Sequence, residues 1–298
     1  MTVNTAARPA VLSEQKPRSL TETRFRPFDL VFKSLSVLAG SVTLAVTVGL
    51  IGYILVKGLP NVSWQFLSGT TSVLNDTVGI LPGIINTLYI IILTLLVAAP
   101  LGVGGAVYLN EYAKKGRLTK VIEFTTEALA GIPSIIYGLF GMMMFNNLLG
   151  LRYSILSGCL TLSIMVLPTI IRTTQEALRT VPTGYREGAA GLGASKWHTI
   201  RTILIPCCKS GIITSLILSI GRIVGESAAL IFTAGLAENL LQNVFTHSLQ
   251  SGASLSVLLY KYADQGDNTT AFAIAAVLVI LVLAINLSAR FVSARTKK

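Results

Sequence analysis

The sequence predicts an all-α fold: a polytopic membrane helical bundle of six transmembrane helices, with one further short cytoplasmic helix between spans 4 and 5. The 298 residues are 52% hydrophobic and only 12% charged, which is about half the charged share of an ordinary globular protein. The mean hydropathy is +0.69. Apolar runs of about 20 residues recur along the chain, each long enough for a helix to cross about 30 Å of hydrocarbon. A soluble globular domain is excluded, and the strands of a membrane barrel would be shorter and alternating.

The chain begins with a polar segment, residues 1–32, which carries five Lys and Arg residues before any apolar stretch. We therefore expect a basic cytoplasmic tail rather than a short signal peptide with a cleavage site. The first apolar run, residues 33–57, is longer than the apolar region of a signal peptide. It is expected to remain in the mature protein as transmembrane helix 1.

Five further spans are recognised by their length rather than by strict periodicity. They are expected at residues 84–109, 121–144, 155–178, 207–233 and 271–291. With their connections they form a five-helix core over residues 84–292. A periplasmic loop at 58–83 precedes this core, and a cytoplasmic tail at 293–298 follows it.

Basic residues are distributed unequally between the two sides of these spans. Twenty of the 24 Lys and Arg residues fall in the N-terminal tail, the loop after span 2, the region from Arg172 to Lys209 and the C-terminal end. Because cytoplasmic loops carry an excess of Lys and Arg, both termini are expected in the cytoplasm. This topology accounts for the net charge of +11, so the charge is no argument for nucleic-acid binding.

The second long periplasmic loop, residues 234–270, contains apolar residues at helical spacing. They are Leu236, Leu240, Leu241, Val244, Phe245 and Leu249. This pattern predicts an amphipathic helix on the outer face of the bundle.

The segment between spans 4 and 5, residues 179–206, is the longest polar stretch on the basic side. Pro182 is expected to end span 4, and Thr183 to cap a short helix. Small residues from Gly188 to Gly191 leave room for another protein to approach the backbone. After Gly193, apolar residues at helical spacing favour a helix along the membrane interface. From these residues alone, a connector that only joins two spans remains an equal alternative.

This segment resembles the EAA signature of ABC importer permeases, whose short helix docks in a groove of a separate ATPase subunit. The matching residues are Glu187, Gly188, Ala189, Gly193, Ile203 and Pro206. The sequence departs from the signature at Gly188, which replaces the first alanine, and at Ile205, which replaces the leucine. The resemblance implies a coupling helix, with ATP and Mg bound by a partner ATPase. The chain lacks the GxxxxGK[ST] pattern that cradles phosphates.

Ionisable residues within the spans are costly and tend to face a bundle interior or an aqueous path. Arg222 and Glu226 lie four residues apart in span 5, so they are expected on one helical face. Arg172 and Glu176 repeat the arrangement in span 4. An arginine with its planar fork of donors suits recognition of a tetrahedral oxyanion. The alternatives are a purely structural Arg222–Glu226 pair and an Arg172 that snorkels to the interface.

Four stretches together resemble the membrane subunits of phosphate-specific ABC importers, and among these the PstA type more than its sister PstC. They are residues 100–112, 131–139, 167–178 and 222–229. The resemblance implies a bacterial plasma membrane protein that forms a heterodimer with a PstC-type permease, within lipid. It also implies two PstB-type ATPases, an external phosphate-binding protein and inorganic phosphate as the substrate. Arg222, Glu226 and Arg172 are then expected along the substrate path.

Alternating access is the expected mechanism, with ATP-driven movement of residues 183–195 transmitted by spans 3 to 5. Gly131, Pro133 and Pro168 are candidates for bends in those spans. An importer of another oxyanion, such as molybdate or sulfate, is the nearest alternative. A regulatory membrane scaffold is a further one. An intramembrane enzyme is disfavoured, because no catalytic or metal-ligand constellation occurs in the spans, and neither a metal nor a cofactor is expected in this chain.

Overall fold

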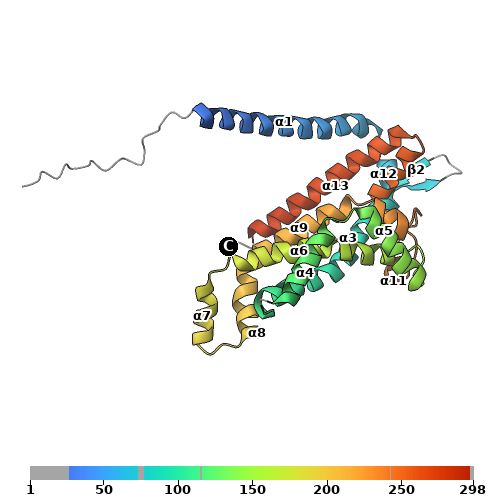
Figure 1. Ribbon diagram of the computed structural model, residues 1–298. Coiled ribbons are helices and arrows are strands. Elements are labelled where there is room, and N and C mark those ends of the chain that lie inside the picture. The colour runs from blue at the N-terminus through green and yellow to red at the C-terminus, as the bar shows by residue number, and fades with distance from the viewer. Residues whose placement is uncertain (1–26, 73–76, 115, 242, 296–298) are drawn as a thin grey trace, which may run out of the picture. The chain divides into compact units, whose positions relative to one another are not determined.

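The computed structural model describes residues 27–72, 77–114, 116–241 and 243–295. It contains two compact units, Met1–Leu50 and Ile51–Lys298. The predicted tails at 1–32 and 293–298 lie mostly outside the described residues. In the first unit, the described residues belong to helix α1 (Pro27–Gly58), which contains the predicted first span (Figure 1).

The second unit is almost entirely helical, which confirms the predicted fold class. In chain order its elements after α1 are η1 (Leu59–Asn61), α2 (Trp64–Ser68), β1 (Thr70–Ser72), β2 (Thr77–Ile80), α3 (Leu81–Val107), η2 (Tyr108–Tyr112), α4 (Arg117–Ala130), α5 (Ser134–Gly141), η3 (Met142–Leu148), α6 (Ile155–Arg179), α7 (Thr183–Gly191), α8 (Lys196–Thr199), η4 (Ile200–Leu204), α9 (Ile205–Val224), α10 (Ala228–Thr233), α11 (Val244–Ser248), α12 (Leu255–Asp264) and α13 (Asn268–Arg295). The segments η2, η3 and η4 are π-helical turns that continue neighbouring α-helices.

Five helical stretches of the described chain are long and apolar enough to cross a membrane. They are Val31–Asn61, Leu81–Tyr112, Ile155–Arg179, Lys196–Val224 and Asn268–Phe291. The predicted third span is instead a bent pair, in which α4 and the stretch α5–η3 meet at 104°. With this pair counted as one span, the number agrees with the predicted six.

The bend in the third span falls at Gly131, Ile132 and Pro133, where the sequence predicts one. Gly131 ends α4 and Pro133 precedes the first residue of α5. Proline lacks an N–H group and disfavours the helical conformation of the residue before it, so the helix stops here. Pro168 has no comparable effect, since α6 continues through it.

The fifth span differs from the prediction at both ends. It begins at Lys196, because α8 and the π-helical turn η4 lead directly into α9. The segment after Gly193 is therefore the start of a span rather than a separate interface helix. The span ends at Val224 instead of residue 233, because Gly225 terminates α9 and a new short helix, α10, begins at Ala228.

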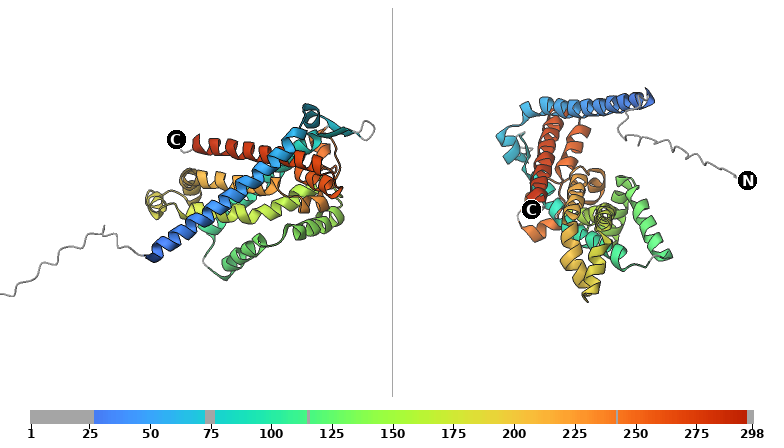
Figure 2. Two further views of the ribbon diagram at one scale, coloured as in Figure 1. Left: turned by 90° about the horizontal axis from the view of Figure 1, so that it is seen from above. Right: turned by 90° about the vertical axis from the view of Figure 1, so that its left-hand side faces the viewer.

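Helices α3, α6 and α9 pack against one another at the centre of the second unit (Figure 2). Buried apolar side chains from all three helices, such as Ile90, Leu162 and Ile223, form the main core. A second, smaller cluster includes Leu178, Ile200 and Leu204, beside the start of α7. We call the end of the bundle that carries α7 and α8 the α7 end, and the opposite end the hairpin end (Figure 1).

The hairpin end is built from the antiparallel strands β1 and β2 and the short helices α11 and α12. Here the predicted helix over residues 236–249 was wrong, since among the described residues of that range only Val244–Ser248 is helical. Side-chain contacts explain the difference: Glu238 accepts a hydrogen bond from Thr71 of β1 at 2.5 Å and pairs with Lys261 of α12 at 2.6 Å. These contacts fix Glu238 in a segment without regular secondary structure, which its apolar spacing does not indicate.

Candidate functional site

Helix α7 carries the first half of the EAA-like motif and is exposed on one side. Glu187 and Gly188 are exposed, and a Cβ on Gly188 would meet nothing within 4 Å. Leu192, directly after the helix, is 91% exposed. The open space at Gly188 and the exposed Leu192 leave this side of α7 accessible to another protein.

The start of α7 differs in detail from the prediction. Pro182 occupies the N-cap position, and no side chain caps the helix. Thr183 is therefore the first residue of the helix rather than its cap. Gly193 follows the helix with φ = +77°, a left-handed conformation in which glycine is favoured because it lacks a Cβ.

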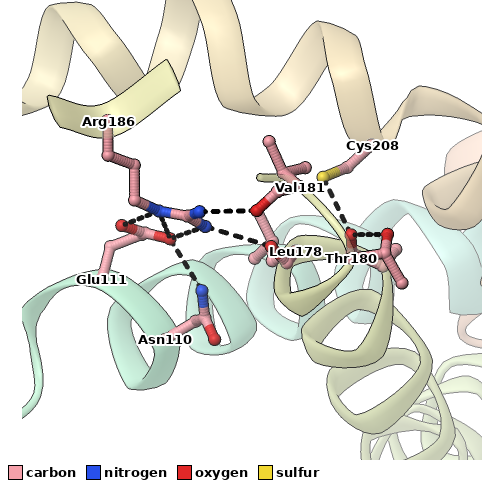
Figure 3. Close-up of polar contacts among 8 residues, drawn as sticks. Asn110, Glu111, Leu178, Thr180, Val181, Arg186 and Cys208 are labelled. Atoms are coloured by element: carbon pink, nitrogen blue, oxygen red, sulfur yellow. Dashed lines mark hydrogen bonds and ion pairs between the residues drawn. The ribbon is translucent and has the colours of Figure 1, made fainter. Parts of the chain in front are cut away.

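The opposite side of α7 is fixed to the bundle by Arg186 (Figure 3). Its Nη2 lies 2.8 Å from Oε1 of Glu111 in η2, and its Nε donates to both carboxylate oxygens at 3.2 and 3.3 Å. Nη1 and Nη2 also donate to the carbonyl oxygens of Val181 and Leu178, each at 3.0 Å. The hydrogen bonds to Glu111 raise the pKa of the Arg186 guanidinium. One side chain thus joins α7 to η2 and to the end of α6.

The second half of the motif lies in the fifth span. Ile203 is half-buried in η4, and Pro206 stands near the start of α9, directly after this π-helical turn. Between the two halves, Ser195 caps α8, and the Nζ of Lys196 lies 5.0 Å from the ring centroid of Tyr112 in η2. The motif therefore consists of an exposed helix followed by the beginning of a span.

Arg172 lies beside a cavity of about 230 Å³ between α4 and α6. Its Nη1 is 3.0 Å from Glu127 and its Nε 3.4 Å from Glu176. In the same cavity Arg179 pairs with Glu123 at 3.2 Å. The predicted Arg172–Glu176 proximity is confirmed, and Glu123 and Glu127 have arginine partners on the adjacent helix.

Arg222 and Glu226 do not form the predicted pair. Arg222 is half-buried in the last turn of α9 and makes no hydrogen bond or ion pair with any residue that the structure describes. Glu226 lies beyond the end of that helix, and its Oε1 accepts a hydrogen bond from the N–H of Ala229 at 3.1 Å. Because Gly225 ends α9, the spacing of four residues no longer places the two side chains on one face.

The two arginines of the predicted path lie at different levels of the bundle. Cys208 Sγ of α9 contacts the carbonyl oxygen of Ala177 in α6 at 3.3 Å. Counting 1.5 Å per residue from this contact places Arg222 about 13 Å farther from the α7 end than Arg172. They are therefore two separate sites along the bundle.

The sequence reasoning missed Glu111, Arg186 and the contact of Lys196 with Tyr112. A cue was present, since Glu111 is an acidic residue at the end of an apolar span. Such a residue needs a cationic partner, and Arg186 stands next to Glu187 in the motif.

A helical membrane bundle with an exposed short helix tied to its spans is the architecture expected of a membrane protein that works with a partner protein. The chain belongs to the family described as "Binding-protein-dependent transport system inner membrane component", which it matches over residues 98–298. It is accordingly an integral membrane permease subunit of an ABC importer and a transport component rather than an enzyme.

Two relatives illustrate the range within this family. The chain is 40% identical to the "Probable ABC transporter permease protein YqgI" of Bacillus subtilis, with 85% of this chain and 91% of that protein covered. It is 34% identical to the "Phosphate transport system permease protein PstA" of Pasteurella multocida, over 80% and 84% of the two chains. The resemblance to PstA-type permeases is confirmed.

The fold is shared with a solved importer. A bacterial alginate ABC transporter, in complex with an alginate pentasaccharide-bound periplasmic protein, contains a chain that superposes with a TM-score of 0.63. The alignment covers 91% of this chain and 97% of that chain at 19% identity. At this level of identity the likeness concerns the fold alone.

Proposed function

We propose that the chain moves inorganic phosphate into the cytoplasm as one of two membrane subunits of an ATP-driven importer. The observation that carries this proposal is Arg222, a half-buried arginine without a carboxylate partner among the described residues. A permanently charged guanidinium with a planar fork of donors suits a tetrahedral oxyanion. The names of the PstA relatives favour phosphate over molybdate or sulfate.

Arg172 has a different role in this proposal. Glu127 and Glu176 occupy its guanidinium, so an arriving anion has to displace carboxylates. Arg222 receives phosphate first, and Arg172 then accepts it only when the helices rearrange. Glu226 acts indirectly, because its contact with Ala229 of α10 orders the backbone just after Arg222.

The proposed partners follow from the exposed surfaces. Glu187, Gly188, Ala189 and Gly193 belong to the docking helix and its turn for a PstB-type ATPase, and Ile203 and Pro206 connect it to the fifth span. A PstC-type sister permease completes the path, a second ATPase serves that sister, and a phosphate-binding protein docks at the hairpin end. In this arrangement both termini are cytoplasmic.

The test is uptake of radiolabelled phosphate by proteoliposomes that contain all partners, with and without ATP. We expect Arg222→Gln to abolish ATP-dependent uptake, Arg222→Lys to retain part of it, and Arg290→Gln to resemble the wild type. Arg290 is a suitable control because it is exposed in α13 and has no ion pair among the described residues. If Arg222→Gln takes up phosphate as fast as the wild type, Arg222 is not part of the substrate path. If the complex takes up sulfate or molybdate but not phosphate, the proposed substrate is wrong.

A further inference from the structure

Helix α3 and its continuation η2 connect the two ends of the bundle. Together they form one stretch, Leu81–Tyr112, with a length of about 48 Å at the rise of an α-helix. The α7 end of this stretch carries Glu111, and the hairpin end carries Asn86 and Thr87. The α-helix continues through Pro100, so the two ends are joined by one uninterrupted helical element, and such elements carry coupling between distant sites.

At the α7 end, the segment between spans 4 and 5, residues 179–206, holds η2 from two sides. The Glu111 side chain is 8% exposed and receives three of the five hydrogen bonds that the Arg186 guanidinium donates. Asn110 adds a hydrogen bond to the same carboxylate at 2.7 Å. On the other side, Lys196 of α8 lies over the ring of Tyr112. A movement of α7 or α8 therefore acts directly on η2.

At the hairpin end, α3 is fixed by buried polar contacts. Asn86 Nδ2 donates to the carbonyl oxygen of Ala253 at 3.2 Å, and Asn86 Oδ1 lies 2.7 Å from Nε2 of His247 in α11. The N–H of Leu255, the first residue of α12, donates to Thr87 Oγ1 at 2.9 Å. Displacement of α3 along its axis would move α11 and the start of α12 with it.

We propose that the Glu111–Arg186 ion pair is the positioning contact through which movement of α7 reaches α3, and that α3 carries this movement to the hairpin end. The inference rests on the proposed docking of α7 on the ATPase. A bidentate arginine–carboxylate pair resists rotation as well as separation. Both a rotation and a translation of α7 would therefore be passed on to η2. The π-helical geometry of η2 provides a locally adaptable turn beside this rigid contact.

The test uses the complete complex in proteoliposomes, with ATP hydrolysis measured with and without phosphate-loaded binding protein. In Glu111→Gln and Arg186→Gln we expect basal hydrolysis to remain and its stimulation by the binding protein to fall at least about fivefold, the lower range of coupling between sites. ATP consumed per phosphate transported rises accordingly. Arg186→Lys keeps the positive charge but lacks the planar fork of donors, so its stimulation should lie between those of the wild type and Arg186→Gln. Arg290→Gln should behave as the wild type.

The double variant Glu111→Gln/Arg186→Gln completes a mutant cycle. If the two residues act as one contact, the double variant loses no more stimulation than either single variant. Undiminished stimulation in Glu111→Gln, or a parallel loss of basal hydrolysis and complex assembly, would overturn the inference and leave the pair a structural contact.

A cross-linking experiment separates this inference from the proposed function. Cys207 is exposed, whereas Cys159 and Cys208 are buried, so a Cys207→Ser background presents a single reactive site when Gly188→Cys is added. If Gly188→Cys cross-links to the ATPase but Glu111→Gln shows unchanged stimulation, only the proposed role of α3 is wrong. Absence of the cross-link in an assembled complex, or absence of stimulation in the wild type, defeats both proposals.

Discussion

Nε2 of His247 lies 2.7 Å from Oδ1 of Asn86, and both residues are buried at the hairpin end. The Nδ2 of Asn86 donates to the carbonyl oxygen of Ala253, so its Oδ1 is the atom that faces the ring. The hydrogen-bond network therefore assigns the ring hydrogen to Nε2. The other ring nitrogen, Nδ1, is buried without a hydrogen-bond partner among the described residues.

The first prediction is a loss of stability in mild acid. Burial lowers the pKa of His247, because the charged ring loses its hydration, and the neighbouring Gln250 side chain offsets only part of this effect. Below about pH 6.5 the unfolded chain binds this proton more readily than the folded chain, so the free energy of unfolding falls by at most about 1.4 kcal/mol per pH unit. Thermal unfolding in detergent at about pH 7.5 and about pH 5.5 measures this slope.

A pair of variants isolates the contribution of His247. His247→Gln should flatten the slope between these two conditions, whereas His198→Gln, at an exposed position of α8, should leave it unchanged. An identical slope in His247→Gln and the wild type would assign the acid sensitivity to other groups.

The second prediction concerns the close packing of α3 on α6. A Cβ on Gly102 would lie 2.6 Å from Cγ2 and 2.8 Å from Cβ of Ile170, whereas a Cβ on Gly104 would meet nothing within 4 Å. Gly102→Ala should therefore lower the free energy of unfolding by about 1–3 kcal/mol. Gly104→Ala, only two residues away, should be neutral or stabilising by up to about 1 kcal/mol. Chemical unfolding in detergent distinguishes the two, and equal effects would contradict the packing argument.

The third prediction concerns the backbone after α7. Gly193 has φ = +77° and open space around its Cβ position, so only conformational strain opposes a side chain there. Gly193→Ala should cost the turn about 1–2 kcal/mol and reduce ATP-coupled uptake. Gly193→Asn should retain much more uptake than Gly193→Ala, since asparagine tolerates the left-handed region. Uptake that is equally low in both variants would point to side-chain bulk at the docking surface.

The fourth prediction separates stability from transport at Arg172. Its ion pairs with Glu127 and Glu176 are more than 60% exposed on both sides, and exposed pairs contribute at most about 1 kcal/mol. Arg172→Gln should therefore unfold like the wild type. Uptake should still fall at least about tenfold, because hydrogen bonds to a charged group contribute about 1.5–3 kcal/mol. Retained uptake would make Arg172 an interfacial residue only.

The length and composition of the apolar runs predict much of this fold, because few backbone structures are stable in lipid. A backbone in hydrocarbon has to satisfy its own polar groups, so long apolar runs become helices. The run predicted at residues 155–178 forms α6, Ile155–Arg179. The length of the apolar run wrongly predicted that the fifth span continues past Val224. The residues of α10 are also apolar, so the run does not show that the helix ends at Gly225.

The candidate site was predictable only where its residues are close in sequence. The exposed helix around Glu187 follows from a local motif, and the bend at Pro133 follows from the chemistry of proline. The partner of Arg186 is 75 residues away, and no helical period relates it to Glu111. Conversely, the spacing of Arg222 and Glu226 predicted a pair that a single glycine prevents.

The separation of Glu111 and Arg186 also determines when this end of the molecule can be completed during synthesis. Helices α4, α5 and α6 are all made between the two residues. With 75 residues to add, a ribosome needs about 4 to 15 s before the arginine follows the carboxylate. Until then Glu111 lacks the guanidinium with which it pairs in the folded chain, and burying its charge without that partner is costly. We therefore expect η2 to close onto the bundle only after α7 has been made.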